Sequence, residues 1–137
     1  MKIETGTKKA GAVKKLTSRK KALLAVAAGQ AIKAGDPVII KIGDLVDYTE
    51  YFVVMHGESS RQVMAIVDNV LTAIRQTGNP RAGGVEGEND GRWVVVDWGD
   101  VIIHVFLKDL RHFYELEKLW ADASRVKVPG EPAPAQI

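Results

Sequence analysis

The chain has 137 residues, enough for one domain with a buried core, and an ordinary globular composition. It contains no cysteine, which excludes a disulfide framework and a thiolate metal site and favours a cytoplasmic location. The net charge of +2 is unevenly distributed. Residues 1–21 hold eight Lys or Arg and one acidic residue, whereas residues 22–137 hold eleven Lys or Arg and sixteen acidic residues. A basic tail therefore precedes an acidic body, which suits a basic protein partner better than direct reading of nucleic acid.

Residues 1–17 lack hydrophobic periodicity and predict a disordered basic tail. The basic stretch followed by "ALLAVAAGQA" is reminiscent of a signal peptide, but its apolar part is short and continues into polar helical sequence. We therefore expect a mature helix from an N-cap at Ser18 to about Ala34. Its predicted apolar face comprises Leu23, Leu24, Ala27, Ala31 and Ile32. No run approaches the roughly 20 apolar residues of a membrane span.

Two β-rich runs follow, at 38–42 and 51–57, and predict strands. The segment "SSRQ" is a capping-box pattern, in which the Ser59 hydroxyl accepts from the Gln62 N–H and the Gln62 side chain reaches back. Apolar residues at helical spacing then predict a long amphipathic helix that Gly78 ends. These apolar residues are Val63, Ile66, Val67, Val70, Leu71 and Ile74.

The second half begins with an irregular connection at 77–91, in which a short edge strand is expected near Val85. Strands at 92–97 and 100–106 and a helix over about 108–123 follow. We predict an α/β (α+β-like) fold, a small mixed sheet flanked by three helices. The predicted organisation is a basic tail over 1–17, a domain over 18–123 and a proline-containing tail over 124–137.

The segment "DWGD" joins the last two strands. A two-residue type I′ loop would force Trp98 to positive φ, so we expect a three-residue loop with Gly99 in the left-handed position. This geometry places Trp98 at the hairpin tip, between Asp97 and Asp100. Two interpretations stay open: Trp98 is an interface anchor for a basic partner, or it folds back onto a helix as peripheral core.

Two polar residues lie among apolar ones. His104 shares a strand face with Ile102 and Phe106, which predicts a buried or half-buried histidine with one good hydrogen bond. Glu117 falls inside the apolar face of the last helix and needs a partner, for which His104 and Arg61 are the candidates.

Catalysis finds little support. "GESS" at 57–60 would suit a phosphate-binding turn, and Asp97 and Asp100 could be metal ligands of a nucleotidyltransferase. The two carboxylates flank a turn rather than converge, however, and "GESS" is explained as a turn and a cap. The histidines show no metal-ligand spacing. We therefore expect that the protein is not an enzyme and that it binds neither a cofactor nor a metal ion.

Several ordered motifs resemble the ribosomal silencing factor (RsfS), or Iojap, family. The matching stretches are "YFVVMHGESSRQV", "EG", "RWVVVDWGDVIIHVF" and "FYELEKLW", within residues 20–121. The family pattern includes Tyr51, Phe52, Gly57, Ser60, Arg61, Gln62, Trp93, Asp97, Gly99, Asp100, His104, Phe113, Tyr114, Glu117 and Trp120. Ser59 belongs to the same structural motif through its cap. Glu50 and Lys41 each stand where the family commonly has aspartate.

The resemblance implies a fold related to nucleotidyltransferases without their catalytic carboxylates. It also implies binding to the large ribosomal subunit through its protein L fourteen, which sterically blocks subunit joining and represses translation. A factor for large-subunit biogenesis is the alternative. We expect Trp98, Asp97 and Asp100 to contact the partner, with Tyr48 and Glu50 as neighbours. The basic tail could touch ribosomal RNA, and an edge strand would allow a homodimer.

Overall fold

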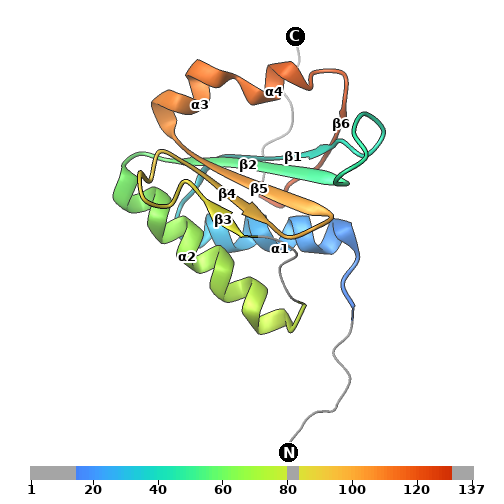
Figure 1. The fold of residues 1–137 in the computed structure, drawn as a ribbon, viewed down its shortest axis with the longest axis horizontal. Coiled ribbons are helices and arrows are strands. Elements are labelled where there is room, and N and C mark those ends of the chain that lie inside the picture. The colour runs from blue at the N-terminus through green and yellow to red at the C-terminus, as the bar shows by residue number, and fades with distance from the viewer. Residues whose placement is uncertain (1–14, 80–83, 131–137) are drawn as a thin grey trace, which may run out of the picture.

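A six-stranded mixed sheet forms the centre of the computed structural model, which describes residues 15–79 and 84–130 (Figure 1). The strands are β1 (Gly35–Lys41), β2 (Tyr51–Gly57), β3 (Val85–Glu86), β4 (Trp93–Asp97), β5 (Val101–Leu107) and β6 (Ser124–Val126). The helices are α1 (Ser18–Gln30), α2 (Ser60–Thr77), α3 (Lys108–Tyr114) and α4 (Leu116–Leu119). The strand order is β3-β4-β5-β2-β1-β6.

The central pair, β2 and β5, is parallel, and the other neighbouring strands are antiparallel. Helices α1 and α2 lie on one face of the sheet, and α3 and α4 lie on the other (Figure 1). Alternation along β5 divides the core as predicted, because Val101, Ile103 and Val105 face α1 and α2 while Phe106 belongs to the opposite cluster. The predicted fold class is therefore confirmed.

Helix α1 differs from its prediction at both ends. Thr17 rather than Ser18 is the N-cap, since its hydroxyl accepts from the Lys20 N–H at 3.2 Å, and the helix ends at Gln30. The predicted apolar face was also wrong in part, because Ala27 and Ala31 are exposed. The buried face consists of small residues, Ala22, Ala25, Val26, Ala28 and Gly29, so the helix packs closely on the sheet.

The unit of β2 and α2 agrees closely with the sequence. The Ser59 hydroxyl accepts from the Gln62 N–H at 3.1 Å, and Gly78 ends the helix with a φ of 73°. The Gln62 side chain reaches back, as predicted, and its oxygen accepts from the Glu58 N–H at 2.7 Å. Its amide also donates to the carbonyls of Ile32 and Lys33, so the cap of α2 holds the end of α1 as well.

The C-terminal region was predicted less well. The expected single helix over 108–123 is broken at Glu115, whose φ of 47° separates α3 from α4. The tail expected from residue 124 was also wrong in its first part, because Ser124–Val126 forms β6 and pairs with β1. Val128 is buried and belongs to the core cluster that also contains residues of α1 and α2. The remainder of both predicted tails, at 1–14 and 131–137, lies outside the described residues.

Candidate partner-binding surface

Trp98 continues the buried face of β4. Its N–H donates to the carbonyl of Val101 at 2.9 Å, so the loop holds only Gly99 and Asp100, and Gly99 has a φ of 78°. Glycine at the first position of a two-residue loop accepts positive φ without strain, which leaves Trp98 in strand register with Val94 and Val96. The left-handed Gly99 is confirmed, but the three-residue loop was wrong.

The indole of Trp98 is consequently 1% exposed, and its Nε1–H donates to the Asn79 carbonyl at 3.3 Å. The expectation that Trp98 projects from the hairpin tip is therefore wrong. The alternative interpretation, a tryptophan folded back into the core, agrees with the structure. The alternation of Val94, Val96 and Trp98 was the sequence signal that could have shown this.

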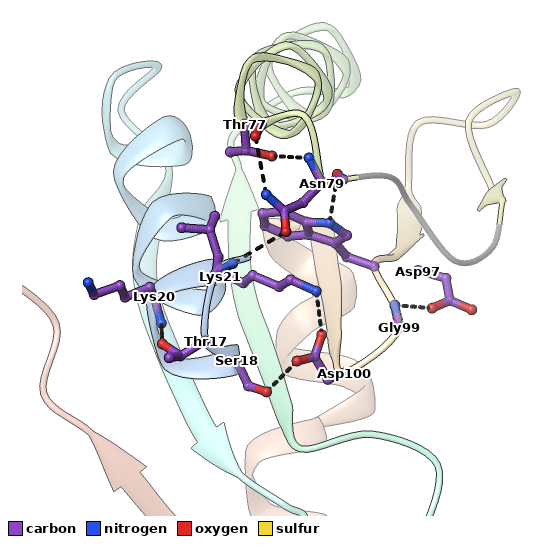
Figure 2. A network of polar contacts seen from close by, with 11 residues as sticks. Thr17, Ser18, Lys20, Lys21, Thr77, Asn79, Asp97, Gly99 and Asp100 are labelled. Carbon is purple, nitrogen blue, oxygen red and sulfur yellow. Dashed lines mark hydrogen bonds and ion pairs between the residues drawn. The ribbon is translucent and has the colours of Figure 1, made fainter. Parts of the chain in front are cut away.

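Asp100 anchors the start of α1 (Figure 2). Its carboxylate accepts a hydrogen bond from the Ser18 hydroxyl and forms an ion pair with Lys21 at 2.8 Å. Burial acts to raise the pKa of Asp100, but the hydrogen bonds from Lys21 and Ser18 outweigh it and hold the pKa below its usual value. The Lys21 ammonium also lies 5.1 Å from the Trp98 ring centroid. Asp100 is thus largely committed to intramolecular contacts.

Asp97 has a local role and some exposure. Its carboxylate accepts from the Gly99 N–H at 2.8 Å, which fixes the loop, and the side chain is half-buried (Figure 2). Asp97 and Asp100 therefore bind different groups within the chain.

In the part of the chain that the structure describes, no group of three His, Cys, Asp or Glu side chains could hold a metal ion. No helix among the described residues is long and apolar enough to cross a membrane.

The connection between β1 and β2 forms an exposed surface, which we call the acidic loop. It contains Asp44, Leu45, Asp47, Tyr48 and Glu50, all of which are exposed. Leu45 is 51% exposed and Tyr48 is 58% exposed, so the acidic loop presents two large side chains with apolar surface to solvent. Residues 43–48 line a shallow hollow. Sequence reasoning missed Leu45, although "GDLVDYTE" shows the mixture of acids and apolar residues.

The acidic loop is tied to the β4–β5 hairpin. The Glu50 N–H donates to the Asp100 carbonyl at 2.9 Å, and the Glu50 carbonyl accepts from Ile42 and Gly43. The loop, the hairpin and the start of α1 consequently gather at one end of the sheet, at the right of Figure 1. Tyr48, Glu50 and Asp97, which sequence reasoning singled out, lie at this end with side chains available to solvent.

His104 and Trp93 lie on the sheet face that carries α3 and α4. The Trp93 Nε1–H donates to His104 Nδ1 at 3.2 Å, which supplies the single hydrogen bond predicted for this histidine. His104 is 7% exposed, and burial lowers its pKa to about 4, so the ring is neutral at pH 7. Trp93 and Val95 are only half-buried on this face, which gives the hairpin an apolar flank.

Glu117 is paired as predicted, but with Arg111 rather than His104 or Arg61. The Arg111 guanidinium donates to a Glu117 carboxylate oxygen at 2.8 and 3.1 Å, and also contacts the Gly35 carbonyl and His56 Nδ1. Burial and the charge of Arg111 lower the pKa of His56. Arg61 is exposed on α2. Arg111 of α3 is therefore bonded to Glu117 of α4, and this link lies at the end of the sheet opposite the acidic loop.

The remaining motif residues have structural roles or lie outside the description. Gly57 is buried because the first turn of α2 packs on it, where an added Cβ would lie 2.9 Å from the Val63 nitrogen. Trp120 packs edge-on against Phe52, with ring centroids 6.2 Å apart. The Tyr114 side chain lies outside the described part of the structure.

The fold and the exposed acidic loop define the class: a small mixed α/β domain that presents an acidic surface with two large exposed side chains. The chain belongs to the ribosomal silencing factor family, since the family profile described as "Ribosomal silencing factor during starvation" matches residues 15–136. The resemblance found from the motifs is thereby confirmed.

Individual proteins agree with this membership. Ribosomal silencing factor RsfS of Halalkalibacterium halodurans is 39% identical over 107 residues, covering 78% of this chain and 91% of the relative. A mouse protein named mitochondrial assembly of ribosomal large subunit protein 1 is 34% identical over 64% of this chain and 39% of its own. A crystal structure of a Chromobacterium violaceum protein superposes with a TM-score of 0.75 at 30% identity, covering 86% of this chain and 97% of its own. The names of these sequence relatives are regulatory or assembly names and indicate no catalytic activity.

Proposed function

We propose that this protein acts in the cytoplasm by binding protein L fourteen of the large ribosomal subunit, and that it thereby keeps the two subunits apart and represses translation. The acidic loop carries the proposal. It exposes two large apolar side chains, Leu45 and Tyr48, among three carboxylates, and an apolar anchor ringed by acids is complementary to a basic protein surface. A domain of this size bound on the joining face of the large subunit would obstruct the small subunit by its volume.

The roles of the hairpin residues follow from their burial. Tyr48 and Glu50 are the proposed direct contacts, and the half-buried Asp97 lies beside them at the same end of the sheet. Trp98 and Asp100 support this end instead, because the indole is buried and the Asp100 carboxylate binds Ser18 and Lys21. In this proposal Trp98 supports the surface from inside the core and makes no direct contact with the partner.

The test is binding to purified protein L fourteen, measured by calorimetry for the wild type and for the Tyr48→Ala and Glu50→Gln variants. We expect Tyr48→Ala to weaken binding about tenfold, as is usual for an aromatic anchor, and Glu50→Gln to weaken it less. The matched controls are Leu119→Ala and Asp68→Asn, an exposed apolar residue on α4 and an exposed acid on α2. Equal binding by Tyr48→Ala and Leu119→Ala would reject the acidic loop as the docking surface.

Assembly of the large subunit is the second candidate, favoured by the name of the mouse relative. Depletion of the protein in cells separates the two functions. Aberrant large-subunit precursors on a sucrose gradient would indicate assembly, whereas normal large subunits and an increased level of joined ribosomes would indicate silencing.

A homodimer formed through the acidic loop would compete with the partner for the same surface. The molar mass of the protein in solution is therefore measured at the concentration used for binding.

A further inference from the structure

The first turn of α1 has an unusual charge. It carries Arg19, Lys20 and Lys21 and no acidic residue, although the N-terminal end of a helix favours negative side chains and disfavours positive ones. Lys15 precedes this turn, and the chain before it contributes Lys2, Lys8, Lys9 and Lys14 against the single acidic residue Glu4. Helix stability does not explain this arrangement, which indicates that the charges serve another purpose.

Four cationic side chains lie at the start of α1, and among the described residues only one of them, Lys21, forms an ion pair. The ammonium of Lys21 pairs with Asp100 and its side chain is 12% exposed. Lys15, Arg19 and Lys20 are exposed, and no ion pair joins any of them to another of the described residues. Figure 2 shows the Lys20 side chain directed away from the Asp100 network. We call Lys15, Arg19 and Lys20 the basic segment.

The position of the basic segment is fixed by its neighbours. Ser18 and Lys21 both bind the Asp100 carboxylate, and the Leu16 N–H donates to the Asn79 side-chain oxygen at 3.3 Å (Figure 2). Asn79 in turn accepts from the Trp98 indole. The buried hairpin residues therefore hold the basic segment at the end of the sheet that also carries the acidic loop. Two surfaces of opposite charge lie at one end of the molecule.

We propose that the basic segment binds the phosphate backbone of RNA while the acidic loop binds a basic protein. The inference rests on the proposed function only in choosing RNA as the polyanion. Lysine and arginine side chains without an aromatic residue among them suit phosphates rather than bases, so binding is independent of sequence. The acidic body, including the acidic loop, repels RNA, which confines the contact to the basic segment itself.

The experiment is fluorescence anisotropy with a labelled RNA hairpin of arbitrary sequence, across a series of salt concentrations. The test protein is Lys15→Gln, Arg19→Gln, Lys20→Gln, which removes the basic segment and keeps the network around Asp100. The control protein is Lys33→Gln, Arg75→Gln, Lys127→Gln, which removes the same charge from exposed positions elsewhere. We expect the test protein to bind RNA about tenfold more weakly than the wild type at low salt, and the slope of log K against log salt to fall by about two. The control protein should bind nearly as the wild type does.

Three results would overturn the inference: no RNA binding by the wild type, equal weakening in the test and control proteins, or tighter binding of the wild type to polyglutamate or to anionic lipid vesicles than to RNA. Binding to protein L fourteen is measured with the same proteins and keeps the two proposals distinguishable. Loss of RNA binding with unchanged protein binding supports the inference, whereas a wild type that binds RNA but not protein L fourteen overturns the proposed function alone.

Discussion

Arg111 and Glu117 are six residues apart in the sequence, yet the guanidinium donates two hydrogen bonds to one oxygen of the carboxylate, at 2.8 and 3.1 Å. In a continuous helix, residues six apart point in directions that differ by roughly 120° around the axis. The break at Glu115 brings the two side chains together. Because Arg111 is only 6% exposed, its charge depends on Glu117 for compensation.

The first prediction concerns this ion pair. Glu117→Ala is expected to lower the free energy of unfolding by about 2–3 kcal/mol, less than for a fully buried pair because the Glu117 side chain is 23% exposed. Glu117→Gln should lose roughly half as much, since its amide oxygen can still accept from Arg111. Urea unfolding followed by circular dichroism measures both. Asp122→Ala, an exposed acid on the same segment, is the control and should change stability by less than about 0.5 kcal/mol.

The pH dependence of this difference has a definite sign. Burial acts to raise the pKa of Glu117, but the hydrogen bonds and charge of Arg111 outweigh it and hold the pKa below the ordinary 4.5. The ionised carboxylate therefore favours the folded state above pH 4.5, and this contribution is lost as the pH falls through the lower folded pKa. A stability difference between wild type and Glu117→Gln that stayed constant down to the lowest measurable pH would contradict the pairing.

The second prediction concerns His104. Burial lowers its pKa to about 4 from the ordinary 6.5, so protonation favours the unfolded state. The wild type should lose up to about 3 kcal/mol of stability through this residue as the pH falls from 6.5 to 4. His104→Gln, which does not titrate, should show a flatter dependence over the same range. Identical pH profiles for the two proteins would show that His104 is not buried in its neutral form.

The third prediction separates burial from exposure at the proposed partner-binding end. Trp98→Ala should lower the free energy of unfolding by about 3–5 kcal/mol, because it opens a cavity in the core and removes a hydrogen bond to Asn79. Tyr48→Ala, at an exposed aromatic residue, should change it by less than about 0.5 kcal/mol. Urea unfolding of both variants measures these losses. Similar losses of unfolding free energy for the two variants would contradict the buried position of Trp98.

The fourth prediction concerns close packing at the start of α2. Gly57→Ala places a Cβ 2.9 Å from the Val63 nitrogen, which belongs to backbone and cannot move aside cheaply, so we expect a loss of about 1–3 kcal/mol. Gly84→Ala is the matched control, because nothing lies within 4 Å of its added Cβ. Thermal unfolding compares the two, and equal melting temperatures would show that α2 does not approach Gly57 so closely.

Local patterns predicted the parts of the fold whose signals are local. The β2–α2 unit follows from β-rich sequence, the Ser59 cap and the left-handed Gly78, each within a few residues of the element it defines. The break between α3 and α4 has no such signal, because Glu115 is an ordinary helix former held at positive φ by its surroundings. The strand β6 likewise exists only because β1 offers an edge to it.

The candidate surface was predicted in part, for a similar reason. Sequence reasoning identified Tyr48, Glu50, Asp97 and Asp100, and the loop and hairpin that carry them lie together at one end of the sheet. It placed Trp98 outside because the loop was assigned three residues, and a shift of one residue in a hairpin moves a side chain to the other face. Arg111 was overlooked as the partner of Glu117 because their contact requires the broken helix.

The central claim is tested most directly by subunit joining. Purified large and small ribosomal subunits are mixed with increasing amounts of the protein and separated on a sucrose gradient. We predict that the joined ribosome peak falls as the protein saturates the large subunit, with which it sediments, and that Tyr48→Ala requires about tenfold more protein for the same effect. An undiminished joined peak at saturating protein would contradict the account.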